Sequence, residues 1–420
     1  AVHGTLGIAH TRWATHGKPA ERNAHPHMSG VRVAVVHNGI IENHNKLRDQ
    51  LLAAGFSFTS ETDTEVVAHL LAHKLEAGLS LLQAVQEVRR EITGAYALAA
   101  ASPESPDCII VTREGSPLVI GVGEGENFIA SDVAALLQVT QRFIFMEEGD
   151  IAEIRRDGIT IHDANGSEVQ REVQESRLSA CSADKGAYRH YMLKEIHEQP
   201  GVIAETLEGR IHNGRLMEES FGHDIKALLD QTRQVQIVAC GTSYHAGLVA
   251  KYWLEEIGVP CQVEVASEFR YRNTLVAEGH LFVTISQSGE TADTLAALRG
   301  AKGQGYIGSL CICNLPESSL VRESDACLMT RAGTEIGVAS TKAFTTQLVV
   351  LRLLALALAR RQGMSVAQEE ALVNELHALP RQIEVVLLLS DAIEEMAEYF
   401  SEKTHSLYLG RGAFYPVAME

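Results

Sequence analysis

Continuous apolar runs alternate with helical patterns over residues 235–361, and this rhythm constrains the fold more than any other feature. The runs 235–240, 281–285 and 309–313 lack the polar alternation of a half-exposed strand. Residues 246–257 carry apolar side chains at i, i+3, i+4 and i+7, which predicts an amphipathic helix. Strands buried on both faces and joined by helices predict a doubly wound α/β unit with a parallel sheet. Further elements of this unit are expected as strands at 263–266 and 326–329, a turn at 241–243, and helices at 291–302 and 340–361.

The first part of the chain, up to about residue 175, follows a different pattern. Helical spacing predicts two helices, at 43–54 and 64–74. Short apolar runs bounded by Gly and polar clusters predict strands at 6–10, 31–37, 96–101, 109–112, 118–122 and within 143–161. This part is therefore expected to be α+β with mostly antiparallel strands. The polar stretch 165–186 is interpreted as a linker, with helical pattern resuming at Tyr188.

Composition limits the partners that this chain can have. The 420 residues are 45% hydrophobic and 21% charged, which is typical of a globular protein of two or three domains. The net charge of −18 disfavours nucleic acid and anionic lipid as partners. The longest apolar run, 348–359, is interrupted by Arg352 and is too short to span a bilayer. The seven Cys residues show no C-x-x-C spacing and are interpreted as free thiols of a cytoplasmic protein.

Three loops that follow predicted strands are rich in hydroxyl groups. They have the sequences GTS at 241–243, SQSGET at 286–291 and VASTK at 338–342. Helix N-termini offer unpaired N–H groups, and Gly289 allows a close approach of the backbone. Each loop alone could simply cap a helix, but three at one sheet edge favour a phosphorylated ligand. No P-loop or dinucleotide fingerprint is present, so a single phosphate monoester is favoured.

The first part of the chain has its own candidate residues. In HTRWATHG at residues 10–17, Arg12 could bind a carboxylate, or the segment could be a solvated turn. Asn38 and Gly39 form either a hairpin turn or an oxyanion hole. Asp63 either caps a helix or binds an ammonium group. His25-Pro26-His27 lacks a third ligand at fixed spacing, so ordinary polar histidines are favoured over a metal site.

Taken in order, these motifs resemble a known family over essentially the whole chain. HTRWATHG, HNG at 37–39, ETDT at 61–64 and GENFIASD at 125–132 resemble a class II glutamine amidotransferase domain. Residues 240–243, 286–291 and 333–342 resemble a sugar-isomerase (SIS) domain, and residues 184–200 resemble the linker between the two. The combination is similar to the isomerizing glutamine–fructose-6-phosphate aminotransferases. This resemblance implies conversion of glutamine and fructose 6-phosphate to glutamate and glucosamine 6-phosphate, the first step of the hexosamine pathway, by a homodimer without cofactor or metal.

The resemblance also assigns roles by motif. It implies that glutamine is held by Arg12, Thr15, His16 and Asp63, that Asn38 and Gly39 form the oxyanion hole, and that Trp13 gates the passage of ammonia. It implies that the sugar phosphate is bound by Thr242, Ser243, Ser286, Gln287, Ser288, Thr291, Val338 and Ser340.

The resemblance further implies the domain boundaries. We expect an N-terminally truncated amidotransferase domain at 1–176, of the N-terminal-nucleophile αββα sandwich class. A linker with lead-in helices at 177–225 is expected to follow, and then a first SIS domain at 226–365. Connecting helices at 366–396 are expected to lead to the start of a second, truncated SIS domain at 397–420, with a strand at 407–410. The family's nucleophilic Cys, isomerase Glu, ring-opening His and Schiff-base Lys have no counterpart among these 420 residues. We therefore expect this chain to be an internal fragment that does not turn over.

Three alternatives remain at this point. SIS domains also serve as non-catalytic sugar-phosphate sensors, although the sequence shows no effector domain. Other glutamine amidotransferases act on phosphoribosyl groups or aspartate, and those require pyrophosphate or ATP sites. The chain could also be a short natural protein that retains only a scaffolding or regulatory role.

Overall fold

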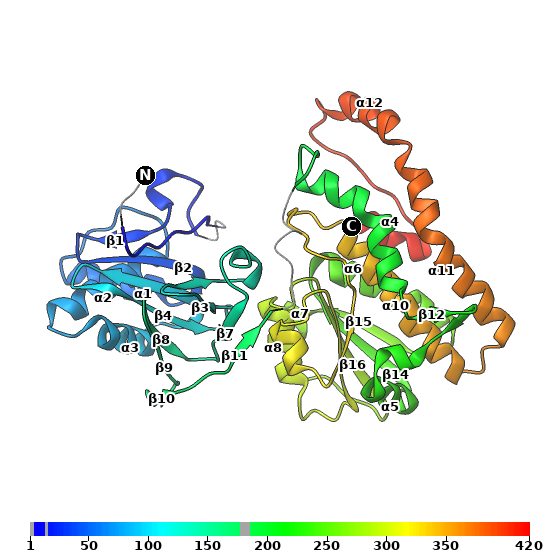
Figure 1. Ribbon diagram of the computed structural model, residues 1–420, viewed down its shortest axis with the longest axis horizontal. Helices are drawn as coiled ribbons and strands as arrows, with labels where there is room; N and C mark the ends of the chain where they lie inside the picture. Colours follow the sequence, from blue (N-terminus) through cyan, green and yellow to red (C-terminus); the bar gives the residue numbers. More distant parts are fainter. Residues whose placement is uncertain (1–3, 13–15, 177–184) are drawn as a thin grey trace. The chain divides into compact units, whose positions relative to one another are not determined.

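The computed structural model describes residues 4–12, 16–176 and 185–420 (Figure 1). The chain forms two compact units, residues 1–180 and 181–420. Within the described part, unit 1 is mainly antiparallel sheet and unit 2 contains a parallel sheet.

Unit 1 contains two antiparallel sheets and three α-helices in its described residues. The larger sheet has the order β1 (His27–Ser29), β2 (Val33–Ile41), β3 (Gly94–Ser102), β4 (Ser105–Glu114), β8 (Ile151–Arg155), β9 (Ile159–His162), β10 (Glu168–Val169). The smaller has the order β11 (Val173–Glu175), β7 (Arg142–Phe145), β5 (Val119–Val122), β6 (Asn127–Ala130). The helices are α1 (His44–Ala53), α2 (Thr64–Glu76) and α3 (Leu81–Glu91), with short 3₁₀ turns at Glu21–Asn23 and Val133–Ala135.

The three helices and the two sheets of unit 1 form successive layers. Apolar side chains of α1, α2 and α3, such as Leu47, Leu71 and Val85, pack with Val35 and Ile110 on one face of the larger sheet. The opposite face of that sheet packs on the smaller sheet. The result is an α/β/β arrangement, in agreement with the predicted α+β class.

Two predictions for unit 1 were wrong, and one helix was missed. Residues 6–10 form no strand, because their backbone pairs with no neighbouring strand and instead lines a cavity. Helix α3 was not predicted, although Ser80 and Gln83 form a capping box that marks its start. Residues 165–175, interpreted as linker, include β10 and β11, which pair with β9 and β7.

Unit 2 is built on a five-stranded parallel sheet, as predicted. Its order is β15 (Cys261–Val265), β14 (Gln234–Ala239), β16 (His280–Ser286), β17 (Gly308–Cys313), β18 (Ala326–Met329). The helices are α4 (Tyr191–Leu207), α5 (His223–Gln231), α6 (Gly241–Glu256), α7 (Ala266–Phe269), α8 (Ala292–Ala301), α9 (Ser319–Glu323), α10 (Lys342–Arg361), α11 (Val366–Leu387), α12 (Ser390–Phe400) and α13 (Tyr415–Met419). Short elements are β12 (Ile211–His212), β13 (Arg215–Leu216), and 3₁₀ turns at Glu218–Phe221 and Gly412–Phe414.

Helices cover both faces of the parallel sheet (Figure 1). The helices α4, α5, α6, α10 and α11 pack on one face, and α7, α8 and α9 pack on the other. By length and composition α10 could cross a membrane, but 78% of its apolar window is buried inside the unit, as in a core helix. From β14 the chain adds β15 on one side and β16 on the other, so the direction of strand addition reverses between β14 and β16. Sheets of this kind bind ligands at that point.

Two local predictions for unit 2 were wrong. Residues 241–243 are not a separate turn, because α6 begins at Gly241, directly after β14. Residues 407–410 form no strand and pair with none of the described strands. The chain there leads instead into α13, which packs on α6.

Candidate functional site

The three hydroxyl-rich segments of unit 2, two loops and the first turn of α6, meet at one pocket of about 210 Å³. Two of them follow β14 and β16, and the third joins β18 to α10, so all lie at the carboxyl edge of the sheet. The pocket is lined by all eight residues predicted for this site, namely Thr242, Ser243, Ser286, Gln287, Ser288, Thr291, Val338 and Ser340, together with Cys240, Ile285, Glu335, Gly337 and Gln347. The structure therefore brings together side chains that are nearly 100 residues apart in the sequence.

The loop between β16 and α8 is shaped by its own hydroxyl groups. The Ser286 Oγ atom accepts a hydrogen bond from the Gly289 N–H at 2.9 Å and lies 3.3 Å from the Thr291 Oγ1 atom. Ser288 Oγ accepts from the Glu290 N–H at 3.2 Å. Gly289 adopts φ +67°, and a Cβ there would lie 2.0 Å from the Ser318 Oγ atom, so only glycine fits. This turn is tight enough to present backbone and hydroxyl groups together.

The pocket suits a phosphate group electrostatically. The helices α6 and α8 begin directly beside it, at Gly241 and Ala292, and their N-termini carry unpaired N–H groups and partial positive charge. Hydroxyl and amide groups supply most of the remaining polar lining, and the one carboxylate in it, that of Glu335, accepts hydrogen bonds from Ser340 and Thr341. A small anion would therefore be bound through hydrogen bonds and helix dipoles.

Three further residues of this site were missed by the sequence reasoning. The carboxylate of Glu335 accepts hydrogen bonds from Ser340 Oγ and the Thr341 N–H, both at 2.9 Å. The Gln347 amide donates to Ser243 Oγ at 3.1 Å. The Glu420 carboxylate accepts from the Thr242 hydroxyl at 2.6 Å. The Gln347 and Glu420 contacts depend on tertiary structure, and the Glu335 contacts depend on how its own loop folds.

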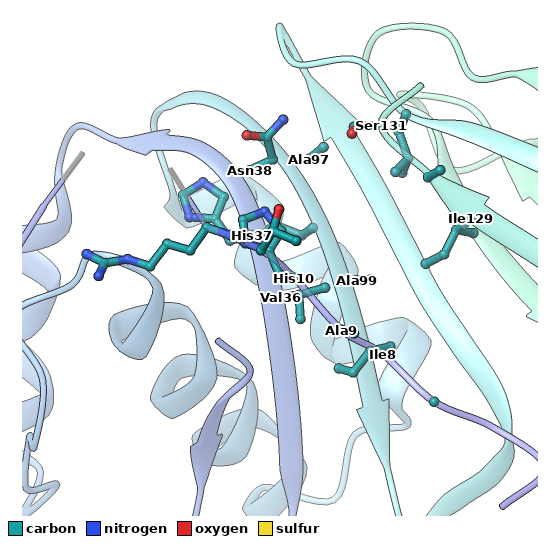
Figure 2. A pocket seen from close by; sticks show the side chains of 16 residues that line it. Ile8, Ala9, His10, Val36, His37, Asn38, Ala97, Ala99, Ile129 and Ser131 are labelled. Atoms are coloured by element: carbon teal, nitrogen blue, oxygen red, sulfur yellow. Dashed lines mark hydrogen bonds between the residues drawn. The ribbon is translucent and has the colours of Figure 1, made fainter. Parts of the chain in front are cut away.

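Unit 1 contains a cavity of about 550 Å³ between its two sheets. Figure 2 shows Ile8, His10 and Val36 on one side of it, and Ile129 and Ser131 on the other. Its lining includes two of the predicted residues, Arg12 and Asn38, as well as His37. Trp13 and Thr15, predicted as gate and glutamine ligand, lie outside the described residues.

The predicted glutamine-binding residues are only partly brought together. Asp63 is 3% exposed, and its Oδ2 atom accepts a hydrogen bond from the Ile41 N–H at 2.8 Å. The His16 Nδ1 atom lies 4.0 Å from the same oxygen. The Arg12 guanidinium instead donates to the carbonyl oxygens of His16, at 2.5 Å, and Gly17, at 2.9 Å. Arg12 thus holds its own loop, while His16 and Asp63 form a pair.

The alternatives for Asn38, Gly39 and Asp63 are decided in part by this geometry. Asn38 and Gly39 lie within β2, opposite Ala97 and Tyr96 of β3, so the hairpin-turn interpretation was wrong. A Cβ at position 39 would lie 2.1 Å from the Ala95 carbonyl oxygen, which explains the glycine. Asp63 precedes α2 but its side chain makes no capping hydrogen bond.

Histidines gather beside the unit 1 cavity and are held neutral by burial. Burial lowers the pKa of His25 to about 3 and that of His37 to about 4, although Asp63 opposes the second shift. His25 and His27 contact the hydroxyls of Thr64 and Thr62 at 3.2 and 3.0 Å. Among the described residues, no group of three or more His, Cys, Asp or Glu is placed to hold a metal ion.

Comparisons with known proteins give a consistent picture. The model of the family "Glutamine amidotransferase domain" matches residues 10–138, and that of the family "SIS domain" matches residues 228–357. The glutamine–fructose-6-phosphate aminotransferase [isomerizing] of Pseudomonas putida is 60% identical over 419 residues, covering 99% of this chain and 69% of its own length. The enzyme of the same name from Escherichia coli K12 is 56% identical over 420 residues, again 69% of its length. The solved C-terminal domain of the Francisella tularensis glucosamine-fructose-6-phosphate aminotransferase is 52% identical with a TM-score of 0.55, covering 56% of this chain and 67% of that one.

Proposed function

The chain belongs to the isomerizing glutamine–fructose-6-phosphate aminotransferase family, and on that premise we propose that it contributes to the transfer of the amide nitrogen of glutamine to fructose 6-phosphate. The products are glutamate and glucosamine 6-phosphate. In this proposal unit 1 binds glutamine and unit 2 binds the sugar phosphate.

The observation that carries the proposal is the single pocket formed by the three hydroxyl-rich segments at the strand ends of unit 2. The Ser286, Ser288 and Thr291 hydroxyls, with the N-termini of α6 and α8, bind the phosphate group. Thr242, Ser243 and Gln287 complete the polar lining of the phosphate site. Val338 and Ser340, from the loop between β18 and α10, also line the pocket, and we assign them to contact with the sugar.

For the amidotransferase half, the proposal assigns roles that follow the family motifs. His16 and Asp63 hold the amino group of glutamine, because the buried Asp63 carboxylate can form a charge-assisted hydrogen bond with an ammonium group and His16 lies beside it. Arg12 and Thr15 hold the glutamine carboxylate, and Asn38 and Gly39 stabilise the oxyanion that forms when the amide is attacked. Trp13 gates the release of ammonia toward the isomerase half. To bind the carboxylate, Arg12 exchanges its two backbone carbonyl partners for the ligand's oxygens.

Ligand binding tests the proposal on the 420-residue chain. We expect isothermal titration calorimetry to show binding of fructose 6-phosphate, with inorganic phosphate as a competitor. Thr291→Val removes a pocket hydroxyl without changing the side-chain shape and should weaken binding about tenfold or more. The matched control is Thr345→Val, because this hydroxyl bonds to the Lys342 carbonyl oxygen and lies outside the pocket lining. A folded chain that does not bind fructose 6-phosphate would refute the proposal.

The 420 residues alone are proposed to bind both substrates without turnover. The family motif for the nucleophilic Cys and the residues of the second SIS domain have no match within them. Detectable glutamine hydrolysis by the purified 420-residue chain would overturn this part of the proposal.

A non-catalytic sugar-phosphate sensor is an alternative function. It predicts fructose 6-phosphate binding without any affinity for glutamine. Titration with glutamine therefore separates the two functions. We further propose, from the family resemblance, that the protein acts in the cytoplasm as a homodimer, which sedimentation at micromolar concentration tests.

A further inference from the structure

The loop that joins β18 to α10 forms one wall of the sugar-phosphate pocket without regular secondary structure. Residues 330–341 contribute Glu335, Gly337, Val338 and Ser340 to the lining. A loop of this length keeps a defined shape only where other groups fix its backbone. The position of Val338 and Ser340 therefore depends on what holds the loop.

Glu195, on helix α4, holds the middle of this loop. Its side chain is not part of the pocket lining and is 2% exposed. Its Oε1 atom accepts hydrogen bonds from the Ile336 N–H at 2.6 Å and the Gly337 N–H at 3.0 Å. Hydrogen bonds from backbone N–H groups to a carboxylate are charge-assisted and directional, so one side chain fixes two successive peptide groups.

Gly337 is shaped to receive this carboxylate. A Cβ at position 337 would lie 2.5 Å from the Glu195 Oε2 atom and 3.5 Å from the Met192 Cα atom. Any larger residue would therefore push the loop away from α4. The contact brings the backbone of the pocket wall directly against the helix.

Two other contacts fix the ends of the same loop. The Asn314 side chain accepts from the Ala332 N–H and donates to the Gly333 carbonyl oxygen, both at 2.7 Å. At the other end, the Lys342 Nζ atom lies 2.7 Å from an oxygen of Glu198, one turn beyond Glu195 on α4. The Glu195 carboxylate holds the middle of the loop, at the residue directly before Val338.

We propose that Glu195 is a positioning residue of the sugar-phosphate pocket, which sets the Gly337–Val338 backbone so that the wall contacts the sugar. The proposal rests on the proposed function, because it takes fructose 6-phosphate as the ligand. The Glu195 carboxylate accepts its hydrogen bonds from residues 336 and 337, and not from the phosphate-binding loop at 286–291. Loss of the anchor should therefore affect recognition of the sugar more than recognition of phosphate.

Calorimetry with fructose 6-phosphate and with inorganic phosphate on the 420-residue chain measures the effects on sugar and phosphate recognition separately. Glu195→Ala should weaken fructose 6-phosphate binding at least tenfold while the affinity for inorganic phosphate changes less than threefold. Glu195→Gln keeps an acceptor oxygen and should restore part of the affinity. Gly337→Ala disturbs the same contact from the loop side and should reproduce the Glu195→Ala pattern. Glu205→Gln, an exposed position of the same helix, is the matched control and should behave as wild type.

The outcomes separate this proposal from the one on which it rests. If the wild-type chain does not bind fructose 6-phosphate, the proposed function fails. If wild type binds and Glu195→Ala binds equally well, Glu195 has no positioning role. Equal loss of both ligands in folded Glu195→Ala would mean a general structural role and would also overturn the proposal. If Glu195→Ala does not fold, the same comparison of fructose 6-phosphate affinity with phosphate affinity in Glu195→Gln and Gly337→Ala tests the proposal.

Discussion

The Asp63 carboxylate accepts a hydrogen bond from the backbone N–H of Ile41 at 2.8 Å, and this bond joins the end of β2 to the start of α2. The strand β1 pairs with β2 only from Val33 to Val35, so the Ile41 N–H is left to a side chain. The same oxygen lies 3.9 Å from the His37 Nδ1 atom. The buried Asp63 carboxylate thus accepts a backbone hydrogen bond and also lies near the imidazoles of His16 and His37.

Asp63→Asn should separate the structural from the binding role of this carboxylate. The amide oxygen can still accept from the Ile41 N–H, so the free energy of unfolding should fall by less than about 1.5 kcal/mol. The negative charge is lost, so glutamine affinity measured by calorimetry should fall about tenfold or more. Asp49→Asn, an exposed position on α1, is the control. Unchanged glutamine affinity in Asp63→Asn would remove Asp63 from the binding site.

Gly289→Ala should disrupt the phosphate loop of unit 2. The substitution forces an alanine into φ +67° and places its Cβ 2.0 Å from Ser318 Oγ and 2.8 Å from Cys313 Sγ. Backbone strain and overpacking together should cost about 2 kcal/mol or more and abolish measurable phosphate binding. Gly303→Ala is a matched control, with φ +82° and no atom within 4 Å of the added Cβ. Denaturant titration of both variants checks the prediction, which fails if they are equally stable.

Glu65 should be among the most important single side chains for the stability of unit 1. It is 3% exposed, and its carboxylate accepts four hydrogen bonds, from the N–H and hydroxyl of both Thr59 and Ser60. Burial raises its pKa, but hydrogen bonds from His69, Ser60 and Thr59 outweigh this and hold the pKa well below its usual range. Glu65→Gln replaces one acceptor oxygen by an NH₂ group, which would then face the N–H and hydroxyl donors of Thr59 or Ser60.

The expected cost of Glu65→Gln is about 2–3 kcal/mol in the free energy of unfolding. Denaturant melts at pH 7 measure it, and Glu76→Gln, at the exposed end of the same helix, should cost less than about 0.5 kcal/mol. A loss below about 1 kcal/mol for Glu65→Gln would show that the loop at 59–60 relaxes around the amide.

The site of unit 2 was predictable from the sequence to a large extent, for a physical reason. Parallel strands place their carboxyl ends at one edge of a sheet, so the sequence alone predicts that the hydroxyls of Thr242, Ser286 and Ser340 lie together. All eight predicted residues line the same pocket. Sequence periodicity also predicted the parallel strands of this unit, because buried runs and amphipathic helices differ clearly in spacing.

The side chains that support this site could not be predicted in the same way. Glu195 and Glu335 act through backbone N–H groups of a loop, and such contacts leave no periodic signal. Residues 6–10 carry strand-like side chains, yet they remain unpaired because pairing depends on which edges the tertiary structure leaves open. Asn38-Gly39 is a strong hairpin signal. In the structure it lies within β2, and the glycine is needed there because the backbone of β3 approaches too closely for a Cβ atom.

The burial of His37 should make the stability of unit 1 depend on pH. It is 3% exposed, and its Nδ1 atom lies 3.0 Å from the Thr64 hydroxyl. Burial lowers its pKa to about 4, an effect that Asp63 opposes and the neighbouring His10 and His16 strengthen. In the unfolded chain an imidazole titrates near its ordinary value of about 6.5. Between these two values the unfolded chain binds a proton that the folded protein does not.

The free energy of unfolding should therefore fall as the pH drops from about 6.5 to about 4, by up to about 1.4 kcal/mol per pH unit for His37 alone. Denaturant melts of wild type and His37→Gln at pH 7 and pH 5 measure this contribution. The variant is less stable at pH 7, because it loses the Thr64 contact, but its stability should decline less steeply with acid. His212→Gln, at an exposed position, should keep the wild-type slope. Equal slopes for wild type and His37→Gln would mean that His37 is already charged in the folded protein, because only the neutral buried imidazole makes acid favour the unfolded chain.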